Sequence, residues 1–303
     1  MKWRKRGRLY TPPGAADWMA THGQVPFAWP LDDRSVRVFF TTKDDRHRSH
    51  IAVAILDLKY MALTAIQADP VMEPGRRGTF DDDGAMMGSL VVTDDGVRCY
   101  YQGYNPGGTV STRTAIGLAT VSQHGDRLTL QRCFDGPVLD RNPLEPIGVG
   151  APFVRHEEGA WRMWYRSDHG WDEDGEPCYG IRHARSFDGI AWQPDADFCL
   201  PPDPQGDRML ARASVLRDGD MYRMWFSARQ LQQPYRIGYA ESKDGTTWSR
   251  RDEIGGLAVS DAGWDCEMVC YPHVFDAGGR RLMLYCGNSY GRSGFGIAEL
   301  EQA

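Results

Sequence analysis

The sequence lacks several features that would assign it to a common class of protein. No run of apolar residues approaches the length of a membrane-spanning helix. The basic start, residues 1–6, is not followed by the apolar segment of a signal peptide. The net charge is −6 at pH 7, so no broad attraction to nucleic acid or anionic lipid is expected. We therefore predict a cytoplasmic protein with neither a membrane nor a nucleic-acid polymer as partner.

The sequence also lacks paired cysteines. Its seven cysteines are odd in number and include no Cys-x-x-Cys, which fits reduced thiols that fill small apolar spaces. Neither His47 with His50 nor His169 with His183 has a carboxylate at a metal-ligand spacing. We predict no cofactor and no catalytic metal, and leave open a structural Ca²⁺ in a central channel.

What the sequence does contain is a repeat. A short aromatic strand, Trp-Arg-Met-Trp-Tyr at 161–165, has a near copy at 222–226 and weaker copies at 36–40, 97–101 and 281–285. The last residues of consecutive copies are 59 to 64 residues apart. Such a near-constant period is typical of a repeat architecture.

Each repeat unit predicts three to four antiparallel strands and no convincing helix. Two units contain the hairpin signal Ser-x-Asp-Gly-x-x-Trp, at 186–192 and 242–248, where the glycine accepts a positive φ. Repeated sheets of this kind predict an all-β, five-bladed β-propeller that forms one domain. The predicted parts are an N-terminal arm at 1–25, a connection at 58–79, and blades at about 26–57, 80–132, 145–198, 208–252 and 263–300.

The last blade has room for only three strands before the chain ends. An uncovered third strand would expose unpaired backbone groups. We predict that residues 3–10 of the N-terminal arm pair on, or pack over, the outer edge of blade five. The alternative is a disordered basic arm.

Several motifs together carry a resemblance to a known superfamily. They lie at 46–49, 81–84, 165–167, 186–192, 242–248, 263–268 and 287–291. With these motifs the chain resembles, from about residue 26 to 300, the five-bladed β-propeller glycoside hydrolases that include invertases, levansucrases, arabinanases and β-xylosidases. The nearer likeness is to bacterial glycosyl hydrolase-like propeller proteins, which are often associated with gene clusters for polysaccharides or specialised metabolites. Because one propeller fold carries many activities, the resemblance specifies fold more closely than function.

The resemblance implies three acids on the innermost strands of blades one, two and three. The sequence departs from that pattern, because the segment 27–31 has no acid before Asp32 and the segment 149–153 has no glutamate. The usual set of three acids therefore cannot be carried over to this chain.

The repeat offers another route to the acids. Equivalent positions of the units place Asp83 and Glu267 at the mouth of a central funnel, and the alternation of side chains places Arg212 and Tyr271 deeper on the same wall. One carboxyl would protonate a leaving oxygen and the other would activate water or attack the sugar. The alternatives are a solvated turn for Asp83 and an ion pair of Arg212 with Glu267 or Asp83.

A second group of polar residues follows the aromatic strands. We predict that Glu176 replaces the missing blade-three acid and that Trp171 stacks on a sugar ring. The arginines suggest an anionic ligand, phosphate or carboxylate. The alternative is that these loops are polar only because they are exposed. The predicted substrate-binding residues are Arg46, Arg48, Arg166, His169, Trp171, Arg212, Arg229, Tyr271, Asn288 and Tyr290.

Two classes of function fit these features. One is a carbohydrate-active enzyme that cleaves or transfers a glycosidic bond, with phosphate as one acceptor. The other is a non-catalytic propeller that binds a sugar or nucleotide sugar, or an enzyme with different chemistry on a decorated sugar. In both classes the partner is a small carbohydrate, sugar phosphate or nucleotide sugar.

Overall fold

The structure is a computed structural model that describes residues 1–171, 175–203, 206–230 and 232–301. Part of the predicted loop from Asp168 to Cys178 therefore lies outside the described residues. The described chain is almost entirely β, as predicted. Its helical segments are short turns: η1 (Asp17–Met19), α1 (Asp252–Gly255) and α2 (Asn288–Gly291).

The described strands pair in five antiparallel groups of four. Group one contains β2 (Thr21–Pro30), β3 (Ser35–Lys43), β4 (Ser49–Asp57) and β5 (Ala62–Ile66). Group two contains β6 (Gly84–Thr93), β7 (Gly96–Pro106), β8 (Thr112–His124) and β9 (Arg127–Arg132). Group three contains β10 (Gly148–Glu157), β11 (Ala160–Trp171), β12 (Pro177–Ser186) and β13 (Gln193–Leu200). Group four contains β14 (Asp207–Asp218), β15 (Met221–Gln230), β16 (Arg236–Ser242) and β17 (Ser249–Arg250). Group five contains β18 (Cys270–Ala277), β19 (Arg280–Cys286), β20 (Phe295–Leu300) and β1 (Trp3–Tyr10).

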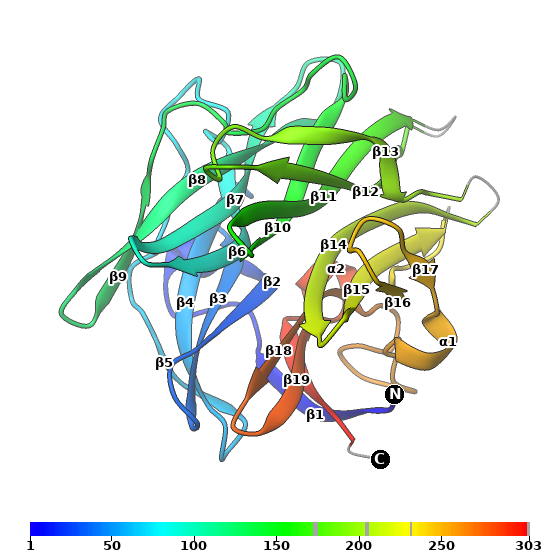
Figure 1. Cartoon of the computed structure of the whole chain (residues 1–303). Coiled ribbons are helices and arrows are strands. Elements are labelled where there is room, and N and C mark those ends of the chain that lie inside the picture. The colour runs from blue at the N-terminus through cyan, green and yellow to red at the C-terminus, as the bar shows by residue number, and fades with distance from the viewer. Residues whose placement is uncertain (172–174, 204–205, 231, 302–303) are drawn as a thin grey trace.

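One strand of each group, the inner strand, lies toward the middle of the molecule (Figure 1). The inner strands are β2, β6, β10, β14 and β18, whereas β5, β9, β13 and β17 lie toward the periphery. Each inner strand contacts the inner strand of the next group, and β18 contacts β2. The inner strands therefore form a closed circuit. The reading of these groups as five blades stays a prediction.

Two segments differ from the predicted division of the chain. The segment expected to connect the first two blades contains β5, which pairs with β4. The inner strand β2 begins at Thr21, inside the segment assigned to the arm. β5 is short and mostly exposed, and β2 begins with the polar residues Thr21 to Gln24, so apolar periodicity marks neither and only pairing with a neighbouring strand reveals them.

The aromatic repeat forms the second strand of each group, namely β3, β7, β11, β15 and β19. Its largest side chains, such as Trp164, Tyr165, Trp225 and Phe226, are 0% exposed. A strand that is packed on both faces reads as a continuous apolar run rather than an alternating one. The aromatic repeat therefore marks the strands that are buried between neighbouring sheets, where the hydrophobic clusters lie.

Three groups share a buried carboxylate that the repeat did not reveal. Tyr101, Tyr165 and Tyr285 each donate a hydrogen bond of 2.9 to 3.0 Å to an acid that lies 20 residues earlier. These acids are Asp81, Glu145 and Asp265, and each also faces a cation: Arg132, Arg182 and Lys5 respectively. In the other two groups phenylalanine replaces the tyrosine, and no acid stands at the same spacing. Tyrosine and acid therefore occur together or not at all, as expected where an unpaired buried carboxylate is costly.

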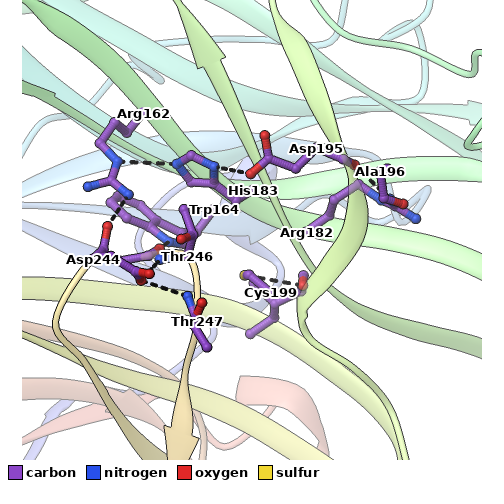
Figure 2. Close-up of polar contacts among 12 residues, drawn as sticks. Arg162, Trp164, Arg182, His183, Asp195, Ala196, Cys199, Asp244, Thr246 and Thr247 are labelled. Carbon is purple, nitrogen blue, oxygen red and sulfur yellow. Dashed lines mark hydrogen bonds and ion pairs between the residues drawn. The ribbon is translucent and has the colours of Figure 1, made fainter.

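The Asp-Gly turns connect neighbouring groups. Gly189 and Gly245 have φ values of 74° and 72°, as predicted for this turn. At the contact between groups three and four, Arg162 donates to the Asp244 carbonyl and Trp164 Nε1 donates to the Gly245 carbonyl, both at 2.7 Å (Figure 2). The turn of one group is thus held by the aromatic strand of the group before it.

The same contact holds a buried histidine. His183 is 0% exposed, and its Nδ1 lies 2.7 Å from Asp195 Oδ2 (Figure 2). Arg162 Nε donates to His183 Nε2 at 3.2 Å, so the ring hydrogen is assigned to Nδ1. Burial lowers the pKa of His183 to about 4 despite the nearby Asp195. The folded protein therefore keeps this imidazole neutral.

The N-terminal arm closes group five, as predicted. β1 pairs antiparallel with β20, from Trp3 opposite Leu300 to Tyr10 opposite Phe295. The Trp3 indole donates to the Gly255 carbonyl at 3.1 Å. Lys5 Nζ lies 2.7 Å from the buried Asp265 carboxylate. The arm thus covers the edge of β20 and joins the two ends of the chain.

We predict that deletion of residues 1–10 lowers the melting temperature by roughly 5 °C or more. The truncated chain would expose the edge of β20 and leave Asp265 without Lys5. Thermal unfolding followed by circular dichroism measures this change. Lys2→Ala is the control, because it removes only the exposed pair of Lys2 with Glu301 and should shift the melting temperature by about 1 °C or less. An unchanged melting temperature in the deletion variant would contradict the closing role of β1.

His183 predicts a pH dependence of stability. Its folded pKa lies below the ordinary value of 6.5, so the unfolded chain takes up a proton that the folded chain does not. The free energy of unfolding should therefore fall as the pH falls from about 6.5 to about 4. Denaturant unfolding at several pH values should give a shallower slope for His183→Gln than for the wild type. His124→Gln, at an exposed position of β8, should keep the wild-type slope, and equal slopes in all three proteins would contradict the prediction.

Candidate functional site

The inner strands share an irregularity that decides where the candidate side chains lie. Every inner strand contains at least one place where the pairing register shifts by an extra residue, which is a β-bulge, and β2 and β14 contain two. Four of these bulges contain a non-glycine residue with a left-handed φ between 50° and 58°: Val25, Ala151, Arg212 and Tyr271. These four bulges occur at equivalent places of the repeat.

The bulges show that one step of the sequence argument was wrong. Side-chain alternation was expected to place Arg212 and Tyr271 on the same wall as Asp83 and Glu267. An extra residue breaks that alternation, and Asp83 and Glu267 precede β6 and β18 rather than lying in them. Among the described residues, no hydrogen bond or ion pair joins Asp83, Arg212 and Glu267, so the alternative of an ion pair between them is also wrong.

Glu267 does not have the environment that suggested its role. Its side chain is exposed, so the cost of burying an idle carboxylate does not apply to it. Its backbone N–H donates to Asn288 Oδ1 at 2.9 Å, and its carbonyl accepts a hydrogen bond from Arg236. The apolar run that follows, from Met268 to Cys270, is buried without it.

Asp83 has the environment of a candidate acid. It is half-buried, directly before β6. Burial and the neighbouring Asp82 raise the pKa of Asp83, and Lys43 and Arg48 oppose that rise. The backbone N–H of Asp83 donates to the Tyr104 carbonyl at 3.1 Å, which connects the segment before β6 to strand β7. A carboxyl with a raised pKa suits proton donation.

Arg212 and Arg166 lie in one buried neighbourhood. Arg212 is 6% exposed and donates to the Met87 carbonyl, with its guanidinium 5.9 Å from the ring centre of Tyr271. Both arginines lower the pKa of Tyr104, against the larger effect of burial. Side chains of groups two, four and five thus meet around Arg212.

Arg166 is held by two partners. Its Nε lies 2.8 Å from Asp168 Oδ1 and its Nη2 donates to Asp168 Oδ2 at 3.2 Å. A further hydrogen bond of 2.6 Å goes to Thr114 Oγ1. Burial raises the pKa of Asp168 and Arg166 opposes that rise. The pKa of Asp168 stays above its ordinary value, as does that of Asp83, and of the two only Asp168 has a guanidinium against its carboxylate.

An open cleft of about 460 Å³ adjoins this arginine. Its lining includes Arg113, Arg141, Arg166, Asp168, Trp171 and Glu176. Three predicted residues, Arg166, Trp171 and Glu176, therefore come together. Trp171 is 40% exposed, and an exposed ring at the lining of a cleft can stack on a sugar.

Two other predicted residues, Arg229 and Tyr290, meet Glu176 at the contact between groups three, four and five. Arg229 Nη1 donates to Tyr290 OH at 3.0 Å and to Glu176 Oε2 at 3.4 Å. Arg229 also lies over the ring of the buried Tyr235. Glu176 thus lines the cleft and faces a cation, as a replacement acid would.

Four predicted residues have surroundings that favour other roles. Arg46 and His169 are exposed. Arg48 forms an ion pair of 2.8 Å with Asp44. The Asn288 amide oxygen accepts the backbone N–H groups of Glu267 and Met268, so it orders a turn.

The structure adds residues that the sequence reasoning did not select. Lys43, Tyr104 and Asp168 each stand three positions after the last aromatic residue of their repeat, as do Arg229 and Asn288. Because equivalent positions of a repeat reach equivalent places, that spacing is the signal that could have found them. Tyr179 and Tyr235, whose hydroxyls are hydrogen-bonded to each other, carry no such signal.

The described residues also limit the chemistry of the site. Within them, no three His, Cys, Asp or Glu side chains come together as ligands for a metal ion. The cysteines are all free, and four of the seven are buried. No helix in the described ranges has the length and apolar character needed to cross a bilayer.

Comparison with known proteins gives both a family and a fold. No family model matches the chain. Two proteins of Mycobacterium tuberculosis, Uncharacterized protein MT1551 and Uncharacterized protein Rv1502, are each 38% identical to it over 99% of this chain and 100% of their own length. The chain belongs to their family. Relatives of this identity and coverage share the whole fold rather than one segment of it.

Solved structures extend the likeness beyond these two relatives. A complex of BT0996 with RGII is 17% identical with a TM-score of 0.79, covering 99% of this chain and 92% of that protein. A thermostable family-43 glycoside hydrolase is 16% identical with a TM-score of 0.70, covering 97% and 94%. The beta-1,2-mannobiose phosphorylase from Listeria innocua is 11% identical with a TM-score of 0.73, covering 99% and 97%. The structural neighbours are glycoside hydrolase-like propeller proteins, which confirms the resemblance seen in the sequence.

Proposed function

We propose that the chain is a five-bladed propeller and a carbohydrate-active enzyme that acts on a glycosidic bond of a small saccharide in the cytoplasm. One observation carries the proposal. The charged side chains of Arg166, Asp168 and Glu176 line one cleft together with the exposed ring of Trp171. A concave site with a few convergent polar groups is the usual place where a small ligand binds.

In the proposed mechanism two carboxyl groups divide the work. Asp83, whose pKa is raised by burial and by Asp82, donates a proton to the leaving oxygen. Asp168, whose carboxylate lies against the Arg166 guanidinium, acts in its ionised form to activate water or another acceptor, or attacks the sugar directly. Two carboxyls in different environments are the general requirement of glycosidic chemistry. Trp171 in the adjoining cleft supplies a stacking surface for a sugar ring.

Two other acids stay in the proposal as alternatives. Glu176 lines the cleft with Asp168 and can take the place of either carboxyl. Glu267 is exposed, which leaves it accessible to a substrate but gives no reason for a perturbed pKa.

The fold neighbours suggest which saccharides to try. Their names mention RGII, beta-1,2-mannobiose and a phosphorylase. For this chain, a saccharide as donor and either water or phosphate as acceptor fit the combination of carboxyls and arginines.

The second candidate function is binding without catalysis. It is favoured by the inner strands β2 and β10, which place no acid at the positions where the hydrolase pattern has one. It is also favoured by the Arg166–Asp168 contact, because a carboxylate held by a guanidinium can be a purely structural group.

We predict that Asp83→Asn and Asp168→Asn each lower the turnover of a cleaved saccharide by about 100-fold or more. Release of reducing sugar or sugar 1-phosphate from a panel of RGII oligosaccharides and beta-1,2-linked mannosides, with and without phosphate, is the measurement. Glu158→Gln, at an exposed position that pairs with Arg217, should stay within about twofold of the wild type, and Glu267→Gln tests the alternative acid.

Circular dichroism must first show that the variants are folded. Full activity in Asp83→Asn and Asp168→Asn would overturn the assignment of the acids, and loss of activity in Glu267→Gln would move the chemistry to that residue. Binding of saccharides by the wild type without any turnover would favour the second candidate function.

A further inference from the structure

A hydrogen bond repeats at four of the five contacts between neighbouring inner strands in the described chain. The first residue after the aromatic strand core accepts a backbone N–H from the bulge of the next group. The acceptors are Thr41 for Met87, Gln102 for Ala151, Ser227 for Tyr271 and Cys286 for Val25, at 2.7 to 3.3 Å. A short polar or thiol side chain is all that this position needs for the fold.

The contact between groups three and four departs from that rule. The equivalent residue is Arg166, whose side chain has no acceptor atom, and the bulge residue of the next group is Arg212. Two arginines therefore stand where the other contacts pair an acceptor with an uncharged residue. A repeat that breaks its own local rule at one place usually does so for function.

The charge of Arg212 has no counter-charge in the described chain. The residue is 6% exposed, its Nη2 has no hydrogen-bond partner, and it takes part in no ion pair among the described residues. Burial, with Arg166 acting in the same direction, lowers its pKa to about 10, so it stays protonated at neutral pH. A buried charge without a partner is costly.

The carboxylate of Asp168, which pairs with the neighbouring Arg166, does not also balance the charge of Arg212. The Arg166 guanidinium already meets Asp168 at two points and Thr114 at a third. The pair of arginines with Asp168 therefore carries a net positive charge. The other neighbours of Arg212 are Tyr104 and Tyr271, whose hydroxyls can donate hydrogen bonds but supply no negative charge at neutral pH.

We propose that Arg212 forms an anion subsite, which binds a phosphate or carboxylate group through the unpartnered Nη2 of this guanidinium. Arginine recognises both groups by paired, charge-assisted hydrogen bonds. The inference rests on the proposed function only in taking the rest of the ligand to be a saccharide. The anion is then either free phosphate, as a second substrate, or an acidic group carried by the sugar.

The first experiment measures the melting temperature with and without inorganic phosphate at matched ionic strength. The wild type should be stabilised by phosphate or by glucuronate, because a ligand that binds only the folded chain raises its stability. Arg212→Met should lose this response and weaken binding in a calorimetric titration by about tenfold or more. Without any added anion, Arg212→Met should be as stable as the wild type or more stable, because it removes the unpaired buried charge.

Arg217→Met is the matched control. Arg217 lies on the same strand, β14, but pairs with Glu158 at the surface, so its variant should keep the full response to the anion. An equal response in Arg212→Met and the wild type would overturn the subsite, and so would a wild type that responds to neither phosphate nor glucuronate. A structural role for Arg212 would instead make Arg212→Met less stable in every buffer. If Arg212→Met does not fold, Arg212→Lys decides instead: it keeps the charge and loses the paired hydrogen bonds of a guanidinium, so it should weaken anion binding, and binding as tight as in the wild type would overturn the subsite.

The choice of ligand separates the two sources of the anion. Binding of inorganic phosphate but not glucuronate assigns the subsite to a free second substrate, and the reverse assigns it to an acidic sugar. Glucose is the neutral control and should not bind at this position. None of these measurements needs turnover. A protein that binds the anion but cleaves no saccharide would contradict the proposed function alone. A protein that cleaves neutral saccharides but binds no anion would contradict the subsite alone.

Discussion

The structure depends on one constraint: no four-stranded group of this chain can bury both of its faces by itself. Aromatic side chains such as Trp164 and Trp225 are fully buried only because a neighbouring sheet covers them. The inner strands must therefore form a closed circuit, and the two chain ends must meet within one sheet. The pairing of β1 with β20 meets that need. A ring with an open edge would leave apolar faces and backbone groups in water.

Closure also places the polar residues of the site. Lys43, Asp168 and Arg229 stand at equivalent positions near the ends of β3, β11 and β15, so three groups carry a charged side chain at the same place of the repeat. The bulges bend each inner strand and set the direction of Arg212 and Tyr271. The same irregularity that lets the strands fit around a centre thus positions the buried arginines.

Buried charges are paired between the strand groups but are not all paired at the candidate site. Between the strand groups, three buried acids each have a tyrosine and a cation, as Asp81 has Tyr101 and Arg132. At the site, Arg212 is buried with no acid in the described chain to balance it. A folded chain is more stable when each buried charge has a partner. A bound ligand would therefore explain the unpaired charge of Arg212 at the contact between groups three and four.

The sequence was enough to predict the repeat, the all-β class, the glycine turns and the position of the N-terminal strand. Each of these follows from local chemistry that recurs at a fixed spacing. It also indicated Arg166, Trp171, Glu176 and Arg212 as site residues. Tertiary structure alone decided that Glu267 is exposed and that Arg212 lacks a partner. A bulge adds one residue without any composition signal, and burial depends on what the other groups of the ring place opposite a side chain. Neither can be read from one strand at a time.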